Sequence, residues 1–168
     1  MGTTVICAER VLPHPRPHVW SLLADPRRHP LFDASGMVCG LASAAPRAVG
    51  DVFRMDMRYS DGDTVEHYRS DNHVTRYVEG EAIAWVTALP DGEPLGWIWS
   101  YELGDESAGA RVRLIYDWSD TSAENIRRFG APLVDRRGLE ESLRFLVRAC
   151  QPSRSAGTSR FRPEPGGA

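Results

Sequence analysis

The chain has 168 residues, a formal net charge of −3 and a sequence pI near 5.9. This length suits a single domain with one hydrophobic core, and the charge balance excludes nucleic acid and anionic membranes as expected partners, because both are bound by clustered positive charge. All 20 basic residues are arginine, which excludes Schiff-base chemistry on a lysine.

The first part of the chain predicts one strand followed by two short helices. Residues 3–12 are rich in β-branched and apolar side chains and end at Pro13, which is typical of a strand. Pro17 suits the first turn of a helix with a short apolar face. Asp25 followed by Pro26 then marks the N-cap and first residue of a second short helix.

From residue 37 the hydrophobic period changes from helical to alternating. Residues 52–59 alternate apolar and charged side chains, so one face of a strand is buried and the other meets solvent. Further strand segments follow, separated by turns rich in Gly, Asp and Pro. They cover residues 64–77, 83–88, 97–103 and 112–118, and together they predict about six antiparallel strands.

The last regular segments are helical. A capping box at residues 121–124 predicts a short helix that stops at Gly130. Residues 136–150 carry apolar side chains at three- and four-residue spacing, with charged residues opposite, which predicts a long amphipathic helix. Residues 152–168 contain many helix and strand breakers and no period, so we expect a flexible tail after a domain at 1–151.

This order of elements predicts an α+β fold. A curved antiparallel sheet of six to seven strands, wrapped around the long C-terminal helix, buries the apolar faces of both. The two short helices after the first strand complete the domain.

Cysteine and histidine positions argue against a metal or disulfide framework. Cys7, Cys39 and Cys150 form no CxxC pair, so free, buried thiols in a reducing, cytoplasmic setting are expected. The five histidines lack the spacing of a shared metal site, and His14, His18, His29 and His67 are expected in solvent. No phosphate-binding loop occurs, and no apolar run reaches the ~18 residues of a membrane span. We therefore expect no cofactor and no membrane insertion.

Five short motifs follow one another along residues 5–150. They are the Val-Trp-Ser-Leu-Leu-Ala-Asp-Pro-Arg-Arg-His-Pro segment at 19–30, Val49-Gly50-Asp51-x-Phe53, Asn72-x-Val74 before Ile83-Ala84-Trp85, Trp99-x-Tyr101-x-Leu103 before Arg111-Val112, and Glu141-Ser142-Leu143. In this order they resemble the START-like (SRPBCC, Bet v 1-like) superfamily, and within it the bacterial polyketide cyclase/dehydrase-like proteins. The resemblance implies a helix-grip fold with a hydrophobic cavity between the concave sheet face and the C-terminal helix. It implies no particular catalytic residue, since these vary among branches.

The walls of such a cavity would be the inward positions of the strands. Bulky aromatic side chains with polar tips suit a planar, partly oxygenated ligand, although the same side chains can simply interdigitate and fill the core. The predicted ligand-binding residues are Met55, Met57, Tyr59, Asn72, Trp85, Trp97, Trp99, Tyr101, Leu114 and Trp118 from the strands, and Leu139 and Leu143 from the long helix.

The strand at 64–77 holds the polar candidates. If Val74 points inward, the two-residue period also places the even-numbered residues from 66 to 72 inward, whereas a bulge would reverse the first half. Glu66 among aromatic side chains would have a raised pKa and could act as a general acid or base. Tyr68 or Tyr116 could polarise a carbonyl. The alternative for Glu66 is a carboxylate at an exposed strand end.

The sequence therefore predicts a cofactor-independent protein that binds a small hydrophobic molecule, aromatic or polyketide-like, and acts on it as a cyclase or dehydratase. A noncatalytic carrier or sensor with the same cavity is the first alternative, and a partner-binding module with a closed cavity is the second. Glu66 in solvent favours the carrier over the enzyme. A cavity well below ~300 Å³ favours the module. No pattern in the sequence indicates an oligomeric state.

Overall fold

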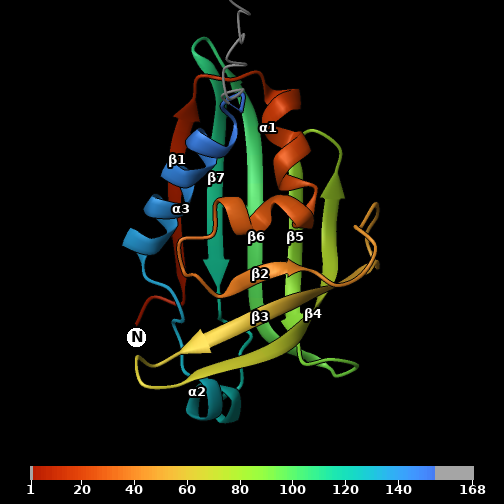
Figure 1. Cartoon of the computed structure of the whole chain (residues 1–168), viewed down its shortest axis with the longest axis vertical. Coiled ribbons are helices and arrows are strands. Elements are labelled where there is room, and N and C mark those ends of the chain that lie inside the picture. Colours follow the sequence, from red (N-terminus) through yellow and green to blue (C-terminus); the bar gives the residue numbers. More distant parts are fainter. Residues whose placement is uncertain (1, 154–168) are drawn as a thin grey trace, which may run out of the picture.

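The computed structural model describes residues 2–153, which form one antiparallel sheet and four helical segments. The strands are β1 (Val5–Leu12), β2 (Val38–Leu41), β3 (Val52–Ser60), β4 (Val65–Val78), β5 (Ala82–Ala88), β6 (Pro94–Glu106) and β7 (Gly109–Asp117). They pair in the order β1-β7-β6-β5-β4-β3-β2, so the chain meanders from β2 to β7 and the first strand closes against the last (Figure 1). Apart from residues 152 and 153, the predicted tail lies outside the described residues.

N-cap residues fix the first residue of several helical segments. They are α1 (Arg16–Leu23), the 3₁₀ helix η1 (Pro26–Leu31), α2 (Ala123–Phe129) and α3 (Arg136–Ala149). As predicted, the Asp25 carboxylate caps η1 by accepting a hydrogen bond from the backbone N–H of Arg27 at 3.1 Å. The N-cap of α2 is Ser122, which accepts from the N–H of Asn125 at 3.1 Å. The capping box predicted to begin at Thr121 is therefore wrong by one residue.

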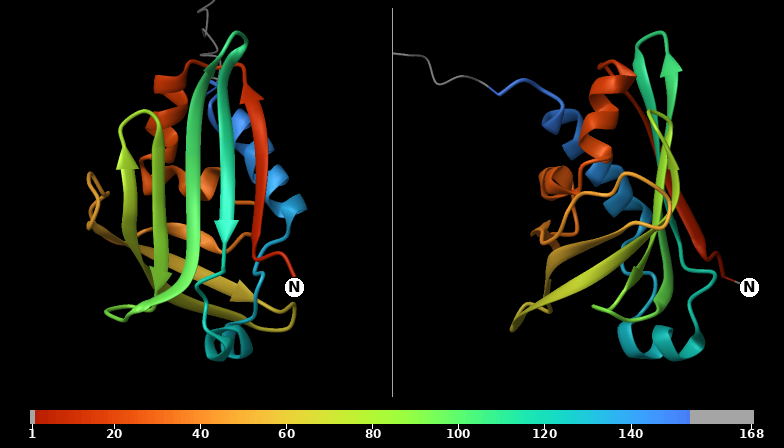
Figure 2. Two further views of the ribbon diagram at one scale, coloured as in Figure 1. Left: turned by 180° about the vertical axis from the view of Figure 1, so that it is seen from behind. Right: turned by 90° about the vertical axis from the view of Figure 1, so that its right-hand side faces the viewer.

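Helix α3 lies across the concave face of the sheet, as the amphipathic pattern predicts (Figures 1 and 2). Leu139, Leu143 and Leu146 on its inner side are buried. Its Ser142 hydroxyl accepts a hydrogen bond from the N–H of Ala34 at 3.1 Å, which fastens the segment after η1 to the helix. This curved sheet around a C-terminal helix confirms the predicted α+β helix-grip fold, with seven strands.

The register of β4 also follows the prediction. Ser70, Asn72 and Val74 are buried on the concave face, with Asn72 opposite Phe53 of β3. The bulge falls later, between Val74 and Arg76, after which Tyr77 turns inward again against α1. The two-residue period therefore holds through the first half of the strand, where the polar candidates lie.

Candidate ligand-binding site

One part of the concave face is closed by its own aromatic side chains. We call His29, Phe32, Phe53, Trp85 and Tyr101 the closed cluster. Trp85 is its centre, with ring centroids 5.4 Å from His29, 5.5 Å from Phe53 and 6.2 Å from Tyr101. All five residues are buried, so this part of the face is packed core.

His29 was expected in solvent, and that expectation is wrong. Helix η1 carries its ring under the surface, where it stacks on Trp85 and its Nε2 lies 2.8 Å from the carbonyl oxygen of Leu23. Burial lowers the pKa of this imidazole, because the charged form loses its hydration. His29 therefore belongs to the core as a neutral ring.

Other residues predicted to contact a ligand also lie in the packed core. Their side chains fill the core on the concave side of the sheet, which is the alternative the sequence left open. They are Met55, Trp85, Trp97, Tyr101, Leu114, Trp118, Leu139 and Leu143.

A second part of the concave face is less completely covered. We call Met57, Tyr68, Trp99 and Tyr116 the groove-side residues, of which Tyr116 is fully buried. Met57 and Tyr68 are half-buried neighbours on β3 and β4. Trp99 is also half-buried and stacks on Tyr116 at 4.2 Å between ring centroids, with 9° between the ring planes. On the other side of Tyr116, Trp118 packs at 5.1 Å.

The sheet opens because the first part of β4 does not pair with β5. The last residue pair between these strands is Asp71 with Ala88, so residues 65–70 of β4 pair only with β3. Figure 2 shows the β3–β4 hairpin diverging from β6 and β7 beyond that point. The concave side of the hairpin therefore faces an opening and not a neighbouring strand.

An ion-pair clamp fixes the point where the strands part. Arg54 donates to both carboxylate oxygens of Asp71 at 2.7 and 2.8 Å and to Asp91 at 2.8 Å, and the N–H of Asp91 donates to Asp71 at 2.8 Å. Hydrogen bonds from Arg54 lower the pKa of Asp71. The clamp lies on the convex face, where it joins β3, β4 and the β5–β6 turn.

A surface groove of about 570 Å³ lies between the end of β3 and the segment that links α2 to α3. It is lined by residues 35–37, 58–60 and 132–135. Leu133 in this lining donates its backbone N–H to the Tyr116 hydroxyl oxygen at 3.3 Å. Tyr59, another lining residue, comes two residues after Met57 and therefore lies on the same face of β3. Met57, Tyr68, Trp99 and Tyr116 do not line the groove themselves, but Leu133 and Tyr59 in its lining connect it to Tyr116 and to the strand position beside Met57.

Helix α2 closes the end of the sheet beside this groove. Gly96 at the start of β6 has φ +94°, and a Cβ there would lie 2.5 Å from the carbonyl oxygen of Asp120, so only glycine allows this close approach. Phe129 at the other end of α2 packs edge-on against Trp97 at 5.5 Å. No residue of α2 is fully buried. The helix is therefore held against β6 by few side-chain contacts.

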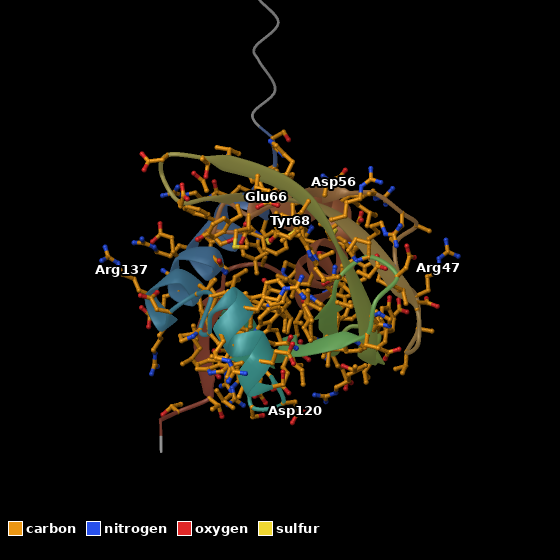
Figure 3. All side chains as sticks on the ribbon, turned by 90° about the horizontal axis from the view of Figure 1, so that it is seen from below. Arg47, Asp56, Glu66, Tyr68, Asp120 and Arg137 are labelled. Carbon is orange, nitrogen blue, oxygen red and sulfur yellow. The ribbon has the colours of Figure 1, made fainter. Side chains whose placement is uncertain are left out.

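The three predicted catalytic residues are not brought together in a buried site. Glu66 lies on the predicted face of β4, opposite Tyr59, but both residues are exposed. The reason is that the hairpin tip extends beyond the elements that could cover it (Figure 3). Glu66 therefore lacks the buried aromatic surroundings that its predicted role requires, and Tyr59 is a rim residue at 53% exposure. Tyr68 and Tyr116 do face inward, and burial raises the pKa of each phenol.

A row of polar side chains crosses the concave face behind Tyr68. Ser70 and Asn72 are each 4% exposed. The Asn72 amide nitrogen lies 3.4 Å from the carbonyl oxygen of Phe53 and 3.4 Å from the Ser70 hydroxyl, and Thr87 of β5 donates to the Asn72 amide oxygen at 3.2 Å. The sequence patterns indicated Asn72, but Thr87 was missed although it follows Trp85 by two residues on β5, a period that could have placed it on the same face.

Metal and thiol chemistry finds little support in the described part of the chain. Residues 2–153 contain no group of three or more His, Cys, Asp or Glu side chains that could hold a metal ion. The three cysteines are free, but only Cys150 is buried, while Cys39 is exposed, so the expectation of buried thiols is wrong for Cys39. Among the same residues, no helix is long and apolar enough to cross a membrane.

Comparison with known proteins supports the fold. No family model matches this sequence, and a search of the curated proteins finds no match. Protein CV1439 from Chromobacterium violaceum is similar in structure, with 22% identity and a TM-score of 0.63 over 89% of this chain and 98% of that one. An AHSA1-like protein from Aeromonas hydrophila has 17% identity and a TM-score of 0.58, over 86% of this chain and 90% of that one.

DynU16, from the dynemicin biosynthetic locus, is also similar, with 16% identity and a TM-score of 0.59 over 88% of this chain. The match spans 47% of DynU16, so the present chain corresponds to about half of that protein. At these identities the neighbours establish the fold alone. The resemblance to START-like proteins that the sequence motifs indicate is thus confirmed at the level of the fold.

Proposed function

We propose that this protein binds a small hydrophobic aromatic molecule at the groove-side residues and acts as a noncatalytic carrier or sensor of it. The observation that carries the proposal is the half-buried state of Met57, Tyr68 and Trp99, together with a groove of about 570 Å³ whose lining residues Tyr59 and Leu133 lead to this part of the face. Ligand pockets of roughly 300–1,000 Å³ lined by aromatic side chains and a few polar groups are typical of small-molecule sites.

A carrier is favoured over a catalyst because of the position of Glu66. A general acid or base needs a pKa shifted toward the working pH, and a carboxylate gains such a shift by burial. Glu66 is exposed at the hairpin tip. The inward polar groups nearby are phenols, a hydroxyl and an amide, which suit hydrogen bonding to a ligand without ionising at neutral pH.

Two exposed leucines allow a matched test. Leu133 lines the groove and is 37% exposed, while Leu89 is 36% exposed in the turn between β5 and β6. We expect 1-aminoanthracene, a planar fluorescent aromatic, to bind the wild-type protein and to lose about tenfold in affinity with Leu133→Arg, because the groove loses an apolar contact of the size of a leucine side chain. Leu89→Arg should bind like the wild type.

Fluorescence titration measures all three proteins. Equal loss in both variants, or no saturable binding to the wild type, contradicts the proposal. Native mass spectrometry of the protein purified from its own host provides a second test, since a carrier should retain a small molecule that Leu133→Arg does not.

A cyclase or dehydratase is the second candidate, and its support is the motif resemblance to the polyketide cyclase/dehydrase-like proteins together with the inward position of Tyr68. In this case Tyr68 would polarise a carbonyl of a reactive polyketone, and shape and exclusion of water would supply much of the rate. We expect Tyr68→Phe to lower the rate of product formation at least tenfold while the affinity for 1-aminoanthracene changes little. Product formation that continues undiminished in Tyr68→Phe would exclude this role.

A further inference from the structure

Two histidine rings lie side by side at the other end of the molecule from the groove. His14 is in the connection between β1 and α1, and His18 is in the first turn of α1. Their ring centroids are 5.7 Å apart, with 55° between the ring planes. His14 is half-buried and His18 is exposed, so the pair is open to solvent. Figure 1 shows this connection beside the last turn of α3.

A hydrogen bond fixes the tautomer of His18. Its Nε2 lies 2.8 Å from the backbone oxygen of Cys150, the C-cap of α3. A carbonyl oxygen can only accept, so Nε2 carries the proton and Nδ1 of the neutral ring keeps a lone pair. Histidines that bind a metal ion through one nitrogen are commonly held in this way, with the other nitrogen donating to a carbonyl or carboxylate oxygen. His18 therefore has the support that a metal ligand needs.

The backbone at His14 is held by an approach that only glycine allows. The N–H of His14 donates to the carbonyl oxygen of Leu12 at 2.8 Å. Gly109 at the start of β7 has φ +141°, and a Cβ there would collide with that oxygen and lie 2.9 Å from the His14 nitrogen. Arg16, between the two histidines in the sequence, pairs with Asp105 of β6 at 3.2 Å. The turn is thus fixed, and the arginine charge beside the histidines is compensated.

The separation of the rings suits two imidazoles on one metal ion. A metal–nitrogen bond of about 2.0–2.1 Å places the ring centre about 3.2 Å from the ion, so two such rings have centres roughly 4.5 to 6.4 Å apart as the angle at the metal opens from a right angle to a straight line. The observed 5.7 Å lies within this range.

From this geometry we infer that His14 and His18 form a binding site for a divalent transition-metal ion of the zinc, nickel or copper class, the ions that imidazole favours. Residues 2–153 supply no third His, Cys, Asp or Glu to such a group, so water completes the coordination. The inference departs from the expectation based on sequence spacing. The reason is that the turn before α1, and not a helical period, brings the two rings together.

A bound ion would connect the turn before α1 with the end of α3. His18 already contacts the backbone of Cys150, and a positive charge near the carboxyl end of a helix interacts favourably with its free carbonyl groups. Because the fold holds the two rings together, the ion should bind the folded chain and stabilise it. This site is separate from the groove, so the inference does not depend on the proposed function.

Isothermal titration calorimetry with NiCl₂ at pH 8 tests the site. Nickel is chosen because imidazole binds it well, whereas zinc also favours thiolates and Cys39 is exposed. We expect one ion per chain, and at least about tenfold weaker binding in His14→Ala and in His18→Ala, because each variant leaves a single imidazole. His67→Ala removes a histidine at an exposed position of β4 and should bind like the wild type, as should Cys39→Ser.

Thermal unfolding gives an independent readout of the same site. Ni²⁺ at 100 times its Kd should raise the Tm of the wild type and of His67→Ala by about 5–10 °C, and the Tm of His14→Ala and His18→Ala by much less. The Tm of each variant without metal shows that it folds. MnCl₂ should have little effect, since Mn²⁺ favours oxygen ligands. Absence of saturable Ni²⁺ binding, full binding to His14→Ala, or equal loss in His67→Ala overturns the inference.

Discussion

Trp85 and Trp99 are direct partners on β5 and β6 and point to the same face of the sheet. Trp85 is buried at 8% exposure under the ring of His29, whereas Trp99 is half-buried and has a single stacking partner in Tyr116. Two identical side chains at paired positions thus have different surroundings. The difference comes from η1, which covers the closed cluster and leaves the groove-side residues bordering an opening.

The largest expected difference between the two environments is the loss of stability when each tryptophan is replaced by alanine. We expect Trp85→Ala to lower the free energy of unfolding by about 3–5 kcal/mol, because it leaves a cavity amid rigid aromatic neighbours. Trp99→Ala should cost roughly 1–2 kcal/mol, since it loses one stacking contact and a partly exposed surface. Urea unfolding at pH 7 measures both values. Equal losses would mean that the groove-side residues are packed core as well.

The sequence was sufficient to predict the parts of this comparison that depend on local periods. The alternation in β3 and β4 placed Ser70, Asn72 and Val74 on the concave face, and the three- and four-residue spacing placed the buried leucines of α3. Both periods are properties of neighbouring residues, so a single sequence contains them.

What the sequence could not predict is which concave residues are covered. Glu66 and Tyr59 have the right period but lie at a hairpin tip beyond the covering elements, and His29 is buried only because η1 lies over Trp85. Coverage depends on contacts between segments distant in the chain, which local patterns do not specify. Thr87 differs from these residues, because it follows Trp85 by two positions on β5 and the local period alone could have placed it on the concave face.

The Arg54–Asp71 ion pair lies between the two environments, at the point where β4 and β5 separate, and substitution of Asp71 should weaken it. Asp71→Asn should cost about 2 kcal/mol at pH 7, because Asp71 is buried and its charged hydrogen bonds to Arg54 become weaker. Asp56→Asn is the matched control, since Asp56 also pairs with an arginine, Arg69, across β3 and β4 but in solvent. Asp56→Asn should lower the free energy of unfolding by less than about 0.5 kcal/mol.

Low pH should remove the stabilisation of the folded state that the Asp71 carboxylate provides. Its folded-state pKa lies below the ordinary value near 3.8, so the stabilisation is complete above that value and disappears as the pH falls through the lower folded-state pKa. Urea unfolding of the wild type and Asp71→Asn should therefore converge below pH 3.8. A constant difference down to pH 2 would show that the clamp acts by shape and not by charge.

A pH profile of stability tests the neutral state of His29 in the closed cluster. Its folded-state pKa is lowered by burial from the ordinary value near 6.5, so below pH 6.5 the unfolded chain binds a proton that the folded protein excludes. Stability should then fall by up to about 1.4 kcal/mol for each pH unit until the folded-state pKa is reached, and be unaffected by this group above pH 6.5. His29→Gln should flatten the profile, while His67→Gln, at an exposed position of β4, should keep it. A wild-type profile that is flat between pH 6.5 and 5 would mean that the η1 cover admits water to the ring, and the distinction between closed and groove-side residues would then lose its physical basis.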